Sequence, residues 1–189
     1  MLAIVQHIRF SNLQSKFMKI SRILLCLAFV LCVSFSGFAQ KQPAENFSAA
    51  ALDGQTVELD SLKGKVVLIT FWNTRCPICD SEIPKLNRMA TSYKGKDVVF
   101  LGLTTDNPTR VESFLKMKPF NFNIIPSSFG VLMKYADRDP AGNITMGYPA
   151  YFLVNQNGEI EMKTNGWDKT EKLNTQINRL LTDGKSKAE

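Results

Sequence analysis

The sequence predicts an α/β fold organised around two buried strands and the helix between them. Residues 66–71 and 97–105 are short, continuous apolar runs, as expected for strands that are covered on both faces of a sheet. The residues after Cys76 have helical spacing, because apolar side chains such as Ile83 and Leu86 share one face. A strand, a helix and a strand at this spacing predict two parallel strands joined by a right-handed crossover.

A small β-hairpin is expected ahead of this unit. Residues 47–52 and 55–59 flank Asp53-Gly54, and an Asp-Gly pair between two such runs is a strong signal for a tight turn. Residues 60–64 are then expected to form a short helical turn that a glycine closes. The hairpin therefore leads directly into the first buried strand.

The segment after the second buried strand is expected to be less regular. Residues 107–117 begin with Asn-Pro, which favours the start of a helix, and residues 120–126 fit a short edge strand. A serine is expected to cap a second short helix that runs to Ala136. Residues 137–145 are polar and contain both proline and glycine, which predicts a loop.

Another hairpin and a closing helix complete the predicted domain. Residues 148–154 form a third apolar strand, residues 155–158 a turn that ends in Asn-Gly, and residues 159–163 the return strand. Residues 170–181 carry apolar side chains at helical spacing, which predicts an amphipathic helix that packs on the sheet.

The N-terminal 39 residues have the form of a secretory signal peptide. Lys19 and Arg22 precede an apolar run at residues 23–35, and small residues follow before a cut after Ala39. The apolar run is shorter than a membrane span requires. Met18 offers an alternative start, because the chain from there to Ala39 is a complete signal peptide by itself.

Export and cleavage define the expected organisation of the chain. Residues 1–39 would be removed, residues 40–46 would form a flexible arm, and residues 47–189 would form one domain. The mature protein is therefore expected in the periplasm, or otherwise outside the cytoplasm, with no stable membrane insertion after cleavage.

The net charge of +6 does not indicate a nucleic-acid partner. Residues 1–39 carry four basic residues and no acidic one, which leaves 19 basic against 17 acidic residues in the remainder. No basic patch interleaved with aromatic residues occurs in the sequence. Binding to nucleic acid is therefore not expected.

Two cysteines lie where the first buried strand meets the helix. A helix N-terminus stabilises a thiolate, and the thiolate is the nucleophile in disulfide exchange. Cys26 and Cys32 would leave with the signal peptide, as would His7, the only histidine. The mature chain would then hold only Cys76 and Cys79.

These absences exclude several kinds of cysteine site. A cysteine protease needs a histidine base, covalent haem needs a histidine after the second cysteine, and a four-cysteine zinc site needs two more ligands. A peroxidase is not favoured, because the pattern Pro-x-x-x-Thr-x-x-Cys is missing. A redox pair, a structural disulfide and a soft-metal site for an ion such as Cu(I) stay open. No cofactor is expected, and the redox pair is favoured because an exported protein meets an oxidising compartment.

Four short motifs follow one another along the chain. They are Phe71-Trp72, Cys76-Pro77-Ile78-Cys79, Pro84, and Gly147-Tyr148-Pro149 ahead of Asn157-Gly158. In this order they resemble the thioredoxin-fold proteins of the TlpA/ResA type, which are exported thiol–disulfide oxidoreductases. The resemblance covers residues 47–181. It implies a three-layer α/β/α fold with a central mixed sheet and an additional N-terminal β-hairpin.

The resemblance also implies a role for each residue of the site. Cys76 would be the nucleophile that forms a mixed disulfide with the substrate, and Cys79 would resolve that intermediate. Pro149 would be a cis proline that faces the two cysteines. Glu82 would tune the cysteine pKa values and move protons; the alternative is a solvated carboxylate that only complements the helix dipole.

The remaining site residues would contact the substrate. Trp72, Pro77, Ile78 and Tyr148 are expected around the cysteines, with a plain core aromatic as the alternative for Trp72. The partners implied are protein thiols and disulfides together with a membrane electron donor. Reduction of protein disulfides is the expected direction, but the Pro-Ile order between the cysteines departs from the usual thioredoxin order. Oxidation or isomerisation is therefore the alternative direction.

Overall fold

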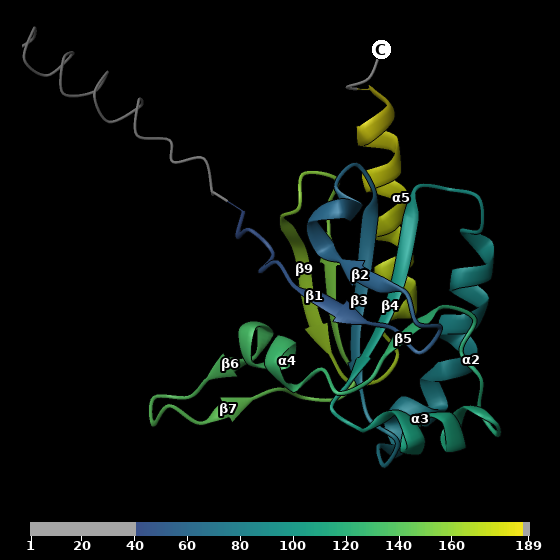
Figure 1. The fold of residues 1–189 in the computed structure, drawn as a ribbon. Coiled ribbons are helices and arrows are strands. Elements are labelled where there is room, and N and C mark those ends of the chain that lie inside the picture. The colour runs from purple at the N-terminus through teal and green to yellow at the C-terminus, as the bar shows by residue number, and fades with distance from the viewer. Residues whose placement is uncertain (1–40, 187–189) are drawn as a thin grey trace, which may run out of the picture. The chain divides into compact units, whose positions relative to one another are not determined.

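The structure of the protein is a computed structural model that describes residues 41–186 (Figure 1). The predicted signal peptide at residues 1–39 and the alternative start at Met18 lie outside the described residues. Within residues 41–186, no helix is both long enough and apolar enough to cross a membrane.

The central sheet has five strands. In spatial order they are β5 (Asn123–Ile125), β4 (Val98–Thr104), β3 (Val66–Trp72), β8 (Ala150–Val154) and β9 (Ile160–Asn165). The strands β3, β4 and β5 run parallel, whereas β8 is antiparallel to both β3 and β9. The predicted mixed sheet and its parallel crossover are confirmed.

Helices α2 (Pro77–Ser92) and α5 (Thr170–Ser186) cover one face of this sheet. Val66 and Leu68 alternate along β3 and point toward these helices, as the two-residue repeat of a strand requires. The same apolar cluster contains residues from both helices, from the C-cap of α2 at Tyr93 and from β8. They are Leu86, Met89, Tyr93, Leu173, Ile177, Leu180, Tyr151 and Leu153.

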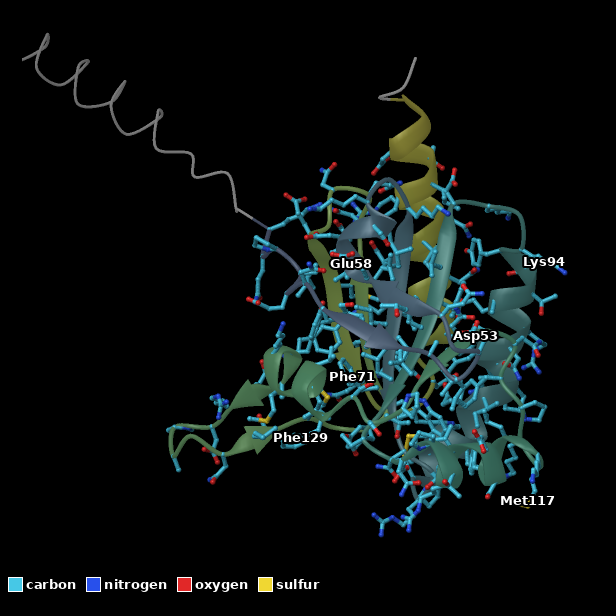
Figure 2. All side chains as sticks on the ribbon, viewed as in Figure 1. Asp53, Glu58, Phe71, Lys94, Met117 and Phe129 are labelled. Atoms are coloured by element: carbon cyan, nitrogen blue, oxygen red, sulfur yellow. A yellow bond between two sulfur atoms is a disulfide. The ribbon has the colours of Figure 1, made fainter. Side chains whose placement is uncertain are left out.

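The other face is covered by the short helices η1 (Leu59–Leu62) and α4 (Phe129–Tyr135) and by the N-terminal hairpin. Phe71 points into this layer, where its ring centroid lies 5.7 Å from that of Tyr135 (Figure 2). Phe129, at the start of α4, does not point into this layer and is 58% exposed (Figure 2). Covered faces on both sides of the sheet give the predicted three layers.

The N-terminal hairpin consists of β1 (Ser48–Ala50) and β2 (Thr56–Glu58). The strands pair antiparallel around the predicted Asp53-Gly54 turn, where Gly54 has a φ of 83° that suits glycine. The Leu52 amide donates a hydrogen bond of 2.9 Å to the Ile124 carbonyl in β5. The predicted hairpin is therefore confirmed, and it is bonded to the edge of the main sheet.

Helix α3 (Pro108–Leu115) follows β4, as the Asn-Pro pair predicts. The Asn107 side chain accepts a hydrogen bond from the Arg110 amide and caps the helix. Val111 is fully buried against Trp72 and Ile124, so α3 closes the sheet near the carboxyl end of β3.

The prediction of a plain loop for residues 137–145 is wrong. The segment forms a second hairpin from β6 (Asp137–Arg138) and β7 (Ile144–Thr145), which projects away from the sheet (Figure 1). Its turn is organised by the Asp139 carboxylate, which accepts hydrogen bonds from the amides of Ala141 and Asn143. The Asp139 side chain thus holds the turn in one conformation by accepting hydrogen bonds from the amides of the turn.

Candidate active site

The two predicted cysteines lie together at the N-terminus of α2 and form a disulfide with a Cα–Cα distance of 5.2 Å. Cys76 is the N-cap residue, and its Sγ accepts a hydrogen bond of 3.0 Å from the Cys79 amide. Cys76 is partly exposed, whereas Cys79 is only 3% exposed. The pair therefore has an outer sulfur that a partner can reach and an inner sulfur shielded by the core.

The turn between β3 and α2 is fixed by side-chain hydrogen bonds. The Asn73 side chain accepts from the Arg75 amide at 2.9 Å, and the Thr74 amide donates to Asp106 Oδ2 at 2.8 Å. Because hydrogen bonds hold both of these amides, the loop has one conformation and Cys76 has a fixed position.

Asp106 is a site residue that the sequence interpretation missed. It is 9% exposed and follows β4, so it lies at the same edge of the sheet as the end of β3. Besides the Thr74 amide, its carboxylate accepts from the Thr104 hydroxyl at 3.4 Å and lies 3.8 Å from Arg110 Nη1. An acidic residue directly after a buried strand was the available signal, because parallel strands end at a common edge.

The peptide bond between Tyr148 and Pro149 is cis, and Pro149 is buried. Tyr148 is half-buried and packs against the same apolar cluster as Cys76 and Trp72. Burial, and then the negative charge of Asp106, raise the pKa of the Tyr148 hydroxyl. Tyr148 is therefore close to both the cysteine pair and the loop that holds it.

Trp72 lies beneath the pair, in one apolar cluster with Cys79. It is 1% exposed, and its ring centroid lies 5.3 Å from that of Phe114 and 4.8 Å from that of Phe120. Gly102 faces the indole, where an added Cβ would lie 3.2 Å from Trp72 Nε1. This placement fits a core aromatic that supports the cysteines, and a direct contact with a substrate stays a prediction.

Pro77 and Ile78 occupy the first turn of α2, between the two cysteines. Both are exposed, and Ile78 is 45% exposed although its side chain is apolar. An apolar side chain that faces water next to the outer sulfur can contact a bound polypeptide. The structure thus brings these residues to the place where the prediction needs them.

Glu82 is fully buried, one helical turn after Cys79. Its Oε1 accepts a hydrogen bond of 2.9 Å from Lys85 Nζ, and its Oε2 has no hydrogen-bond partner. Burial, and then the negative charge of Glu82, raise the pKa of the Tyr151 hydroxyl on β8. Glu82 is therefore not the solvated carboxylate of the alternative interpretation, a position that Asp80 occupies instead, with a side chain 33% exposed and paired with Lys118.

The chain is similar to a set of known redox proteins. The sequence pattern of the AhpC/TSA family matches residues 41–163. The thiol-disulfide oxidoreductase ResA of Bacillus cereus is 26% identical over 178 residues, which are 86% of this chain and 99% of that protein.

Two solved structures have a similar fold. A thiol:disulfide interchange protein of the thioredoxin family from Chlorobium tepidum aligns with a TM-score of 0.67 and 22% identity, over 77% of this chain and 99% of that chain. StoA from Bacillus subtilis aligns with a TM-score of 0.57 and 26% identity, over 70% of this chain and 96% of that chain. The residues matched by the family pattern include the strand, turn and helix that carry the two cysteines.

Proposed function

Because the chain belongs to the AhpC/TSA family and is a thiol–disulfide oxidoreductase, we propose that it reduces disulfide bonds of other proteins outside the cytoplasm. The observation that carries this proposal is the asymmetry of the pair. Cys76 is partly exposed at the helix N-terminus, whereas Cys79 is buried behind it. Such a pair can attack a large substrate with one sulfur and release it with the other.

The reaction starts from the reduced pair. The Cys76 thiolate, stabilised by the N-terminus of α2, attacks one sulfur of the substrate disulfide, and the other substrate sulfur leaves as a thiolate. Cys79 then loses its proton and attacks Cys76 Sγ, which breaks the mixed disulfide and releases the second substrate thiolate. Two electrons pass from the enzyme dithiol to the substrate, and the two substrate thiolates take up protons.

A substrate polypeptide would lie between two surfaces of the site. On one side is the exposed Ile78 with Pro77, and on the other is the backbone of Tyr148 before the cis Pro149. An extended segment can pair with that backbone while its disulfide meets Cys76. Tyr148 and Ile78 are therefore the residues that we expect to influence substrate choice.

The proposed location and electron source rest on the N-terminal sequence. Residues 1–39 have the order of a cleavable signal peptide, which would deliver the domain to an oxidising compartment. A reductant in that compartment must be reduced again after each turnover. We propose that a membrane electron donor supplies these electrons.

The redox potential of the pair tests the direction of the reaction. The full chain with Cys26→Ser and Cys32→Ser is equilibrated with glutathione or dithiothreitol buffers, so that Cys76 and Cys79 are the only thiols. We expect a potential near or below that of thioredoxin, roughly −270 mV. A value near roughly −120 mV would instead identify an oxidant and overturn the proposed direction.

A further inference from the structure

One lysine connects the buried carboxylate of α2 to a distant part of the chain. Lys85 Nζ lies 2.9 Å from Glu82 Oε1 and 3.0 Å from Asp168 Oδ1, and Asp168 is 83 residues further along the sequence. The same Nζ lies 5.2 Å from the centroid of the Trp167 ring. Lys85 is therefore held by three side chains, two of which belong to the link between β9 and α5.

The conformation of residues 166–169 is consistent with a segment that fixes the position of the Lys85 side chain. Asp168 has a φ of 58°, a left-handed conformation that side chains other than glycine rarely adopt. Trp167 is 62% exposed, so its position is not explained by burial in the core. Hydrogen bonds to Glu82 and then to Asp168 raise the pKa of Lys85, and the lysine accordingly stays charged.

The charges around Glu82 make Lys85 decisive. Among the described side chains of residues 41–184, Lys85 is the only cation that forms an ion pair with Glu82. Arg88 and Glu171 line the same hollow as Lys85, but among the described side chains Arg88 forms no ion pair with Glu82. The other titratable groups nearby are neutral or negative: Cys79 on α2, Tyr151 on β8 and Asp168 in the link. The ion pair with Lys85 matters because an unpaired charge in the protein interior is unfavourable.

We propose that Lys85 is a positioning residue for thiol–disulfide exchange, which binds Oε1 of Glu82 and so holds the carboxylate where its Oε2 can accept the proton of Cys79. The Trp167-Asp168 segment holds Lys85 in place. In the resolving step the Sγ–H bond of Cys79 breaks, and its proton passes to the carboxylate of Glu82, whose Oε2 has no other partner. The bond between Cys79 and Cys76 forms, the bond between Cys76 and the substrate breaks, and the substrate sulfur leaves with the electron pair.

This inference rests on the proposed function, and an aromatic disulfide reagent separates its steps. The reduced full chain with Cys26→Ser and Cys32→Ser is mixed with 5,5′-dithiobis(2-nitrobenzoate) in a stopped-flow instrument. The first thionitrobenzoate is released when Cys76 attacks, and the second when Cys79 resolves the mixed disulfide. The first phase thus reports an intact, reactive Cys76, and the second reports the removal of the Cys79 proton.

Lys85→Met is the decisive variant. We expect its second phase to be slower by at least about tenfold at neutral pH, since general-base assistance of this kind contributes factors of about a hundred or more. The first phase should not change. The difference should disappear at alkaline pH, where Cys79 ionises without a base.

Three further variants separate this role from a structural one. Lys118→Met removes the cation from Asp80 on the same helix, and both phases should match the parent protein. Lys85→Arg should restore the second phase. In a Glu82→Gln background Lys85→Met should have no additional effect, because both changes act through one carboxylate.

The outcomes distinguish this inference from the proposed function. A parent protein that never releases the second thionitrobenzoate would overturn both. A normal second phase in Lys85→Met, or equal effects of Lys85→Met and Lys118→Met, would overturn the role of Lys85 alone. If Lys85→Met does not fold, Asp168→Asn decides: a second phase slowed at neutral pH supports the proposal, and an unchanged one overturns it.

Discussion

Helices α2 and α5 pack side by side on one face of the sheet, but they bury different chemistry (Figure 1). Helix α5 buries only apolar side chains, such as Leu173 and Ile177, within its described part. The C-terminal half of α2 does the same with Leu86 and Met89. Its N-terminal half buries one apolar side chain, Ile83, together with Cys79 and the carboxylate of Glu82.

The ion pairs of the two helices differ in the same way. Arg179 of α5 pairs with Glu161 on β9, and Glu161 also pairs with Lys41 at 2.5 Å. Both cations are about half exposed, and together they pair with a Glu161 side chain that is only 6% exposed. Glu82, by contrast, is fully buried with a single cation. One amphipathic pattern thus serves stability in α5 and chemistry at the first turns of α2.

The largest effect is expected from the outer cysteine of α2. Cys76→Ser should abolish disulfide exchange, because the attacking sulfur is lost, while the reduced protein keeps its stability since the residue is only partly buried. Reduction of a protein disulfide and chemical denaturation measure the two quantities. Retained activity would show that Cys76 is not the nucleophile.

Cys79→Ser should stop the reaction one step later. The mixed disulfide between Cys76 and the substrate would form and then persist, because no second sulfur is present to resolve it. Mass spectrometry of the non-reduced protein should find this adduct, and Cys76→Ser provides the control without it. An absence of adduct would contradict the assigned order of the two cysteines.

On α5, the expected effect is on stability and not on chemistry. Ile177→Ala removes a fully buried side chain and should lower the free energy of unfolding by about 2–5 kcal/mol. The exchange rate of the folded protein should not change. A variant that keeps its stability but loses exchange would break the contrast between the two helices.

Glu82→Gln on α2 should slow the chemistry and leave the stability nearly unchanged. We expect the resolving phase to slow by about a hundredfold at neutral pH, because the amide cannot accept a proton. The free energy of unfolding should change little, because Lys85 is partly exposed and keeps its ion pair with Asp168, so that no buried charge is left unpaired. An unchanged resolving phase would mean that Glu82 has no part in the proton transfer.

The smallest effect is expected from the ion pair between Arg179 of α5 and Glu161. Although burial alone would raise the pKa of Glu161, its ion pairs with Lys41 and Arg179 lower it below the ordinary value. The pairs therefore stabilise the fold above the ordinary glutamate pKa, and this contribution is lost as the pH falls through the lowered value. Arg179→Gln should destabilise by less than about 1 kcal/mol at neutral pH. The difference from the parent should vanish in acid, as denaturation at both pH values would show.

Most of the fold could be predicted because its signals are local. The continuous apolar runs of β3 and β4, the Asp53-Gly54 turn and the Asn-Pro start of α3 each act within a few residues. The β6–β7 hairpin could not, because it depends on how the Asp139 carboxylate reaches the amides of its own turn. The polar composition of residues 137–145, taken alone, predicts a loop.

The site was predictable in its cysteine pair and in the cis Pro149 that the family resemblance implies. The spacing of Cys76 and Cys79 indicates the pair, but the depth of Glu82 depends on β8 and on the link after β9, which lie far away in the sequence. The contact between Asp106 and the Thr74 amide spans 32 residues and likewise requires the assembled sheet.

The β6–β7 hairpin is a place where residues can be inserted without disturbing the central sheet. In the part of the chain that the structure describes, its two strands pair only with each other, so insertions at its tip would leave the main sheet in register. At its base, Met146-Gly147-Tyr148 alone separates β7 from Pro149. A peptide fused into the tip should therefore leave thiol–disulfide exchange intact, whereas an insertion at the base should displace Tyr148 and Pro149 and impair it.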